Sequence, residues 1–370
     1  MSCDDVVIVG AGAIGLMAAL TLAEAGLVVR VLERGQIGQE ASWAGGGILS
    51  PLHPWRYHPE VRQLAAAGMA AYPKLAQSLR EHTGIDPEWR ASGLLILEDE
   101  AYPFPDDPVG FGAGEGYSWT LMDDRQVALR FPGFHLRPGQ RALWCPEVAQ
   151  VRNPRLLKAL HRRCLQLGVR LETGVEVCGF DRDDGGRLHA IVTAERVIPC
   201  TRAVVTAGAW TGRLLQSADL ALPIKPIRGQ MLLLQATPGA LPSLLLRGPH
   251  YLVQRTDGLL LVGSSSEDVG FEKSSTTAIR EELLEFAREC FPAARTYAVL
   301  RQWAGLRPGS PDNRPFIGAV PQWQGLFVAS GHFRYGLTMA PITATLLAEQ
   351  ILSDSDSAVF SSNFGYPYQP

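Results

Sequence analysis

Three glycines near the N-terminus, Gly10, Gly12 and Gly15, have the spacing of a dinucleotide-binding turn. In this pattern the first glycine permits a tight turn, the second lets a pyrophosphate approach the backbone, and the third lets the next helix pack on the sheet. Ala13 and Ile14 complete the turn at the start of that helix. Free N–H groups and a partial positive charge at a helix N-terminus favour phosphate binding.

The elements around this turn support the same interpretation. Residues 6–9 predict a buried strand, the apolar stretch to Ala25 predicts a helix, and residues 28–32 predict a second strand that ends at Glu33. An acid at this place can accept hydrogen bonds from the ribose of an adenosine. An ordinary βαβ unit with a glycine-rich turn does not explain that acid. Arg34 would flank the ribose, and an arginine there could instead indicate a 2′-phosphate, which the retained acid argues against.

Composition excludes several classes of protein. The 370 residues are 46% hydrophobic with a formal net charge of −3, which gives no electrostatic case for binding nucleic acid or an anionic membrane. The six cysteines form no C-x-x-C pair and no Cys/His cluster with metal-ligand spacing, so we expect no metal and a cytoplasmic enzyme with reduced thiols. The uncharged stretch 6–23 is interrupted by glycines and flanked by acids, unlike a signal or membrane segment.

Hydrophobic periodicity and turn residues predict alternating helices and strands along the chain. Pro73 predicts a kink or break in the first long helix, residues 102–118 predict a surface loop that could act as a lid, and the tail from Ser353 is expected to be loose. The predicted helices cover 60–80, 153–167, 278–289 and 336–352, and the predicted strands cover 90–98, 169–171, 175–180, 203–210, 231–234, 251–255, 259–262 and 326–329.

Six further segments match one known family in its own order. They are 42–47 (SWAGGG), 203–210 (ending AGAW), 226–230 (PIRGQ), 303–308 (WAGLRP), 312–318 (including RPFIG) and 331–336 (GHFRYG). With the N-terminal turn, these segments make the chain resemble the D-amino acid oxidase family of FAD-dependent amine oxidases. Within that family it is most similar to the glycine oxidases of the ThiO type, which serve bacterial thiamine biosynthesis.

The resemblance covers essentially the full length and implies a fold. We expect a mixed α/β (α+β) chain in which a Rossmann-like FAD-binding domain carries an inserted, antiparallel β-rich substrate domain. The expected FAD-binding domain is discontinuous and comprises 1–88, 142–220 and 300–370. The expected substrate-binding domain comprises 89–141 and 221–299.

The resemblance also implies which residues contact FAD. Ser42, Gly45, Gly46 and Gly47 would run past the flavin, where small residues let the backbone approach the rings, and Val175 would place its backbone beside adenine. A second helix N-terminus would face the pyrimidine end of the flavin and stabilise its reduced, anionic form. The other expected cofactor residues are Gly208, His332, Phe333, Arg334, Tyr335, Gly336, Leu337 and Thr338.

The mode of FAD attachment follows from the cysteines. Family members that bind flavin covalently use a cysteine in the C-terminal part of the chain. The last cysteine here is Cys290, so we expect FAD to bind non-covalently.

Arg307 is the principal candidate for substrate binding. A planar guanidinium can pair with both oxygens of an amino acid carboxylate, and the arginine of Trp-x-Gly-x-Arg-Pro does so in this family. The alternative is a surface arginine in a salt bridge. By resemblance, Tyr251 would add a hydroxyl to the same carboxylate, Arg334 would lie near the active site, and Ser266 would border the amine side.

The resemblance implies oxidative deamination of glycine and other small amines, such as sarcosine and small D-amino acids, to an imino or keto acid. Ammonia or an amine and hydrogen peroxide would be the other products. When the substrate amine is neutral, the α-carbon can deliver hydride to flavin N5 without a protein base. His250 and His332 are therefore interpreted as satisfied, partly buried histidines rather than bases. We expect O2 as the acceptor and a homo-oligomer.

Three other functions remain as alternatives. A D-amino acid dehydrogenase would pass electrons to a membrane quinone, but the chain has no amphipathic basic segment. An RNA-modifying flavoprotein is disfavoured by the net negative charge. A catalytically inactive binding protein is disfavoured because Arg307 and the glycine turn are both intact.

Overall fold

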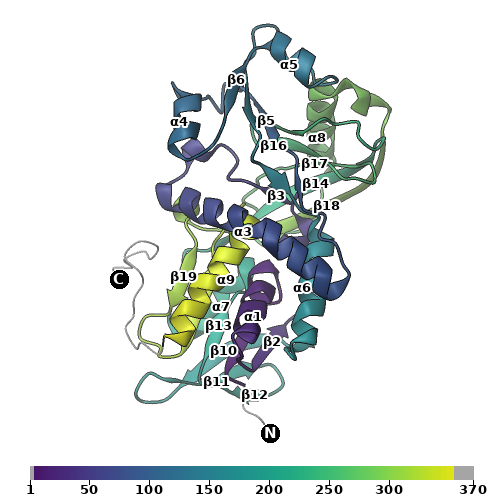
Figure 1. Ribbon diagram of the computed structural model, residues 1–370. Helices are drawn as coiled ribbons and strands as arrows, with labels where there is room; N and C mark the ends of the chain where they lie inside the picture. Colours follow the sequence, from purple (N-terminus) through teal and green to yellow (C-terminus); the bar gives the residue numbers. More distant parts are fainter. Residues whose placement is uncertain (1–3, 354–370) are drawn as a thin grey trace.

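The computed structural model describes residues 4–353, with a six-stranded sheet at its centre (Figure 1). The strand order is β19-β20-β13-β1-β2-β9, and all neighbouring pairs are parallel except β19 with β20. β1 is buried along its whole length, as expected for a strand covered on both faces. The strands are β1 (Val6–Val9), β2 (Val29–Glu33), β9 (Arg170–Thr173), β13 (Ala203–Val205), β19 (Phe316–Ala319) and β20 (Leu326–Ser330).

Long helices cover one face of this sheet, and Figure 1 shows α1 (purple) beside α9 (yellow). The helices of this layer are α1 (Ala13–Glu24), α3 (Pro59–Thr83), α6 (Asn153–Gln166) and α9 (Gly336–Leu352). The buried side chains of a three-stranded sheet share an apolar cluster with Val7 and Val205 of the six-stranded sheet. This cluster is separate from the main hydrophobic core. The three-stranded sheet contains β10 (Val177–Arg182), β11 (Leu188–Thr193) and β12 (Val197–Pro199).

A second large sheet, in the upper half of Figure 1, has eight strands in the order β18-β14-β17-β16-β15-β5-β7-β6. All its neighbouring pairs are antiparallel except β15 with β5, and α8 (Thr277–Cys290) packs on it. Its strands are β5 (Leu94–Leu97), β6 (Thr120–Met122), β7 (Ala142–Cys145), β14 (Lys225–Gln235), β15 (Leu244–Arg247), β16 (His250–Gln254), β17 (Leu259–Gly263) and β18 (Ala298–Gly309).

Short elements join the two large sheets. β3 (Ile48–Leu49), β8 (Ala149–Gln150) and β4 (Arg90–Ala91) form a small sheet. The short α-helices are α2 (Ala41–Ala44), α4 (Pro108–Gly114), α5 (Asp124–Arg130) and α7 (Thr211–Leu215), and 3-10 turns occur at Pro54–Arg56, Gly208–Trp210, Gln216–Ala218, Pro292–Thr296 and Pro311–Asn313. Within residues 4–353 no helix combines the length and the apolar character that crossing a membrane requires.

Three local expectations differ from the structure, at least in part. The strand expected over 203–210 ends at Val205, because the small residues that follow form a turn in which Gly208 has a φ of 54°. The loop expected over 102–118 contains α4, whose first turn is capped by the Asp107 side chain. No break occurs at Pro73, because α3 continues through it as one helix and the proline lies on the exposed side, where water can satisfy the carbonyl that loses its partner. The alternative of a kink at Pro73 stays a prediction.

The expected domain boundaries stay a prediction. Those boundaries place β7 and all of β18 from residue 300 on in the FAD-binding domain, yet both strands pair within the eight-stranded sheet. The expectation of a loose tail concerns residues that, from 354 on, lie outside the described part of the chain.

Candidate active site

A cavity of about 420 Å³ brings together residues from both large sheets. It extends from the first βα turn to the end of β18, which lie some three hundred positions apart in the chain. Most of the predicted site residues line it, whereas Gly15 and Thr338 do not. Those that do are Gly10, Gly12, Ala13, Ile14, Glu33, Arg34, Ser42, Gly45, Gly46, Gly47, Val175, Gly208, Tyr251, Arg307, His332, Phe333, Arg334, Tyr335, Gly336 and Leu337.

Two of the three glycines of the first turn, Gly10 and Gly15, are required by close backbone packing. Gly10 has a φ of 106°, and a Cβ there would lie 2.6 Å from the Thr206 carbonyl oxygen. A Cβ on Gly15 would lie 1.9 Å from the Gly10 carbonyl oxygen. Gly12 differs, because its Cβ would meet only the Ser42 hydroxyl at 3.2 Å. The turn therefore leaves its backbone open to the cavity at Gly12, as a pyrophosphate would require.

Glu33 holds the turn from the end of β2. Its two carboxylate oxygens accept hydrogen bonds from the N–H groups of Ala11 and Gly35, each at 2.8 Å. A carboxylate has about four acceptor positions, so two remain for ribose hydroxyls. The Arg34 guanidinium lies 4.3 Å from the centroid of the Trp210 ring, in a cation–π contact.

Ser42 and Asn153 hold the segment that the resemblance places beside the flavin. The Ser42 hydroxyl accepts a hydrogen bond from the Ala13 N–H at 2.9 Å, which ties this segment to the first turn of α1. Asn153 donates through Nδ2 to the carbonyl oxygens of Ser42 and Gly45 at 2.9 and 3.0 Å. The sequence analysis missed this role of Asn153, because it used the residue only as a helix start.

Arg255 is a second positioning residue that the sequence did not reveal. It is 5% exposed and donates to the Gly46 carbonyl oxygen at 2.9 Å and to the Val151 carbonyl oxygen at 2.9 Å. Burial, reinforced by the positive charge of Arg152, lowers the pKa of Arg255 to about 10. Its charge therefore persists at neutral pH and fixes the glycine segment.

The segment before α9 closes the other side of the cavity. Phe333 has a φ of 48° and donates its N–H to the Pro308 carbonyl oxygen at 2.9 Å. α9 begins at Gly336, so its first N–H groups lie at the cavity wall. Thr338 bonds instead to the carbonyl oxygen of Ile48 at 3.3 Å, which explains why it does not line the cavity.

Arg307 faces the cavity from β18 in a fixed orientation. Its guanidinium donates to the Ser265 carbonyl oxygen at 3.0 Å and to the Ser264 hydroxyl at 2.7 Å. It also lies against Gly229, where a Cβ would come within 2.3 Å of both terminal nitrogens. Burial, together with the charge of Arg334, lowers the pKa of Arg307 to about 10, so it stays protonated at neutral pH.

Neither Arg307 nor Arg334 has a carboxylate within 4.0 Å among residues 4–353. The alternative of a surface arginine in a salt bridge is therefore wrong for Arg307. Two cationic side chains without acidic partners on one cavity wall form an anion-binding site.

Tyr251 lies beside this anion-binding site. Its ring packs against Gly46, where a Cβ would lie 2.6 Å from it, and its hydroxyl donates to the Met231 sulfur at 3.2 Å. Sulfur is a weak acceptor, so a carboxylate would compete well for this proton. The expectation for Ser266 is wrong, because Ser266 is exposed and Ser264 borders the cavity instead.

The two histidines are poor candidates for a general base. His332 is 1% exposed, its Nε2 lies 3.0 Å from the Thr343 hydroxyl, and burial lowers its pKa to about 3. The Nε2 of His250 lies 2.9 Å from a carboxylate oxygen of Glu282, and burial lowers the pKa of His250 although Glu282 opposes the shift. The Nε2 of each ring has a partner, whereas the buried Nδ1 of His250 has none among residues 4–353, so the expectation of satisfied histidines is met only in part.

Comparison with known proteins agrees with this geometry. A family model described as FAD dependent oxidoreductase matches residues 5–350. The chain is similar to a glycine oxidase of Pseudomonas aeruginosa, at 40% identity over 94% of each protein, and to a bifunctional ThiO/ThiG protein of Synechocystis, at 33% identity over 96% of this chain and 52% of that protein. Its fold matches the crystal structure of glycine oxidase from Geobacillus kaustophilus with a TM-score of 0.91, at 26% identity over the whole of both chains.

The chain therefore belongs to the FAD dependent oxidoreductase family, and FAD is its cofactor. The residues present fit that group. The open backbone at Gly12 and the start of α1 suit the pyrophosphate, Glu33 has acceptor positions for the ribose, and the start of α9 suits an electron-rich ring system.

Proposed function

We propose that this protein catalyses the FAD-dependent oxidative deamination of glycine and other small amines, including sarcosine and small D-amino acids, with release of hydrogen peroxide. The observation that carries the proposal is Arg307, a partly buried cation with no carboxylate within 4.0 Å among residues 4–353, which lines the same cavity as the glycine turn. The glycine oxidases among its relatives support the choice of substrate.

In this proposal Arg307 binds the substrate carboxylate through its planar guanidinium, and Tyr251 adds a hydrogen bond from its hydroxyl. Gly46 lies against the Tyr251 ring, and any larger residue at position 46 would displace that ring. Bound FAD would supply the acceptor for two electrons and the hydrogen of the α-carbon. The protein's own residues hold the substrate in place and keep the cavity wall positively charged.

No side chain of the site needs to act as a base. His332 stays neutral and bonded to Thr343, and the substrate amine gives up its ammonium proton to water before reaction. The resulting imino acid would be available for thiamine biosynthesis, a role supported by the relative that is fused as ThiO/ThiG. The enzyme would act as a homo-oligomer in the cytoplasm, which gel filtration and cell fractionation can test.

The experiment is a peroxide-coupled substrate panel on the purified yellow protein. Glycine and sarcosine should be oxidised, D-alanine and D-proline less well, and L-amino acids not at all. Discrimination should be graded, because one methylene in such a pocket is worth about 1–3 kcal/mol. Strong preference for bulky D-amino acids with glycine inert would contradict the proposal, and reduction of a quinone without peroxide would favour the dehydrogenase alternative.

A further inference from the structure

Ser264 follows β17 directly and is among the residues that line the cavity. The residue is buried, borders the cavity, and accepts a hydrogen bond at 2.7 Å from the terminal guanidinium nitrogen of Arg307. A hydroxyl that accepts a hydrogen bond keeps its own proton as a donor. Across residues 4–353 no side chain or carbonyl group accepts that proton. An acceptor in the cavity would complete the bonding of Ser264.

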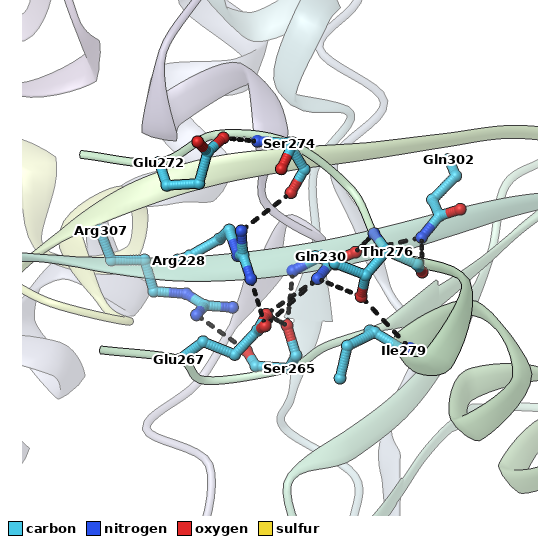
Figure 2. Close-up of polar contacts among 10 residues, drawn as sticks. All are labelled: Arg228, Gln230, Ser265, Glu267, Glu272, Ser274, Thr276, Ile279, Gln302 and Arg307. Atoms are coloured by element: carbon cyan, nitrogen blue, oxygen red, sulfur yellow. Dashed lines mark hydrogen bonds and ion pairs between the residues drawn. The ribbon is translucent and has the colours of Figure 1, made fainter. Parts of the chain in front are cut away.

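The neighbouring polar residues hold this part of the chain rigidly (Figure 2). The Ser265 hydroxyl accepts from the Gln230 N–H at 2.9 Å and donates to Glu267 at 2.6 Å, while Glu267 pairs with Arg228 at 2.6 Å. Partial burial disfavours the ionised form of Glu267, but the bonds from Arg228, Ser265 and Gln230 hold its pKa below the usual range. The segment that carries Ser264 is therefore anchored to β14.

The same pairing separates the charges of the two arginines. Glu267 pairs with Arg228, which is 5% exposed, whereas Arg307 donates its hydrogen bonds, among residues 4–353, to the uncharged oxygens of Ser264 and Ser265. Figure 2 shows the Arg307 side chain directed at Ser265, whose carbonyl oxygen accepts its hydrogen bond. The positive charge of Arg307 is thus left for a ligand.

Three hydrogen-bond donors come from three strands of the eight-stranded sheet or from the residue directly after one of them. Tyr251 on β16 pairs in register with Gly263, the residue before Ser264, and Arg307 on β18 bonds Ser264 directly. All three donors border the cavity. A carboxylate offers about four acceptor positions, which exceeds what one guanidinium can fill.

We propose that Ser264 is a substrate-binding residue whose hydroxyl donates a hydrogen bond to the carboxylate held by Arg307. The inference deepens the proposed function and rests on it for the identity of the substrate. Ser264 would be the third hydrogen-bond donor of the site, beside the guanidinium of Arg307 and the hydroxyl of Tyr251. Its interaction depends only on the carboxylate of the ligand and not on the rest of the substrate.

The test is the binding of acetate to the FAD-loaded enzyme, followed by the change in flavin absorbance, together with steady-state oxidation of glycine. Ser264→Ala should raise the Kd of acetate and the KM of glycine by a similar factor of roughly ten to a hundred, the usual worth of a hydrogen bond to a charged group. kcat should change little, because the contact exists before and during reaction. Ser264→Thr retains the hydroxyl and should stay near wild type.

Ser266→Ala is the matched control, since Ser266 is exposed two positions further on. Unchanged acetate and glycine binding in a folded, flavin-loaded Ser264→Ala variant would overturn the inference. So would equal loss in the Ala and Thr variants when both melt at the wild-type temperature. If Ser264→Thr does not fold, the Ala variant alone decides. Wild-type enzyme that binds acetate with this dependence but does not oxidise glycine would contradict the proposed substrate and leave Ser264 supported.

Discussion

At the scale of single residues, the site is marked by two arginines, Arg307 and Arg334, that have no carboxylate within 4.0 Å in the described part of the chain. Arg307 is oriented by two serine oxygens and by the bare backbone of Gly229, all of which are uncharged. An arginine in a salt bridge would already be neutralised. The arrangement keeps a charge in a buried place, where its interaction with a carboxylate is strong.

Arg307→Ala should collapse turnover of glycine while leaving the flavin spectrum intact. Removing one partner of a buried charge pair costs about 2–5 kcal/mol, or roughly thirty- to several-thousand-fold in kcat/KM. Arg307→Lys should lose less, because an ammonium keeps the charge but not the planar fork. Arg301→Ala, an exposed position on the same strand, serves as the control. Full activity of Arg307→Ala would remove the central assignment.

The pH dependence of catalysis should follow the substrate rather than the protein. Because His332 has a pKa of about 3, it stays neutral across the range in which enzymes are assayed. We expect kcat/KM to rise with pH as the substrate amine loses its proton, with the same profile in wild type and in His250→Gln. Loss of turnover in His250→Gln or His332→Gln, with flavin and fold retained, would instead indicate a protein base.

At the scale of elements, the first βα turn shows most clearly how sequence dictates function. Gly15 does not touch the cavity, yet it lets α1 start close enough to Gly10 for the turn to close. Its effect on the cofactor is therefore indirect, through the position of the helix N-terminus.

Gly15→Ala should lower both FAD content and stability, because its Cβ would lie 1.9 Å from a backbone oxygen that cannot move freely. The ratio of flavin to protein after purification and the melting temperature both report this effect. Gly114→Ala is the control, since a Cβ there has no neighbour within 4 Å and its φ is not positive. A fully loaded Gly15→Ala protein would show that the close approach is dispensable.

His332, just before α9, should make stability depend on pH. Its pKa is lowered from 6.5 in the unfolded chain to about 3 in the folded protein. The unfolded state therefore binds the proton first, so the stability is complete above pH 6.5 and is lost as pH falls toward 3. Between these two pKa values, one such group changes the free energy of unfolding by about 1.4 kcal/mol per pH unit.

Urea midpoints measured between pH 7 and 4 can isolate this contribution. His332→Gln, which can still bond Thr343, should fall less steeply with acid than wild type does. His53, whose pKa burial lowers to about 4, should add a similar slope and is the second histidine to replace. Identical slopes in wild type and both variants would show that neither histidine is protonated preferentially in the unfolded state.

At the scale of the whole molecule, the cavity joins both large sheets around one cofactor. The purified protein should be yellow and should release its flavin into the supernatant on acid precipitation. The reason is that residues 291–370 contain no cysteine that could form the covalent link of related enzymes. Flavin that stays in the pellet of denatured protein would disprove non-covalent binding.

Features that depend on near neighbours in the chain can be predicted from the sequence alone. The glycine turn, the acid that ends β2 and the helix that starts at Gly336 are local patterns, because turn geometry and helix ends are set within a few residues. Arg307 and Tyr251 were predicted as site residues from the resemblance to the family. The cavity brings these distant segments together as expected.

Contacts between residues that are distant in the chain could be seen only in the three-dimensional structure. The pairing of β14 with β18 sets Gly229 against Gly305 and so brings the Gly229 backbone under the guanidinium of Arg307, a contact that depends on strand register. Ser264 and Ser266 are equivalent in an alternating strand, but β17 ends at Gly263, so alternation no longer predicts which one faces inward. Both contacts depend on long-range packing, which cannot be predicted from residue propensities or from spacing in the sequence.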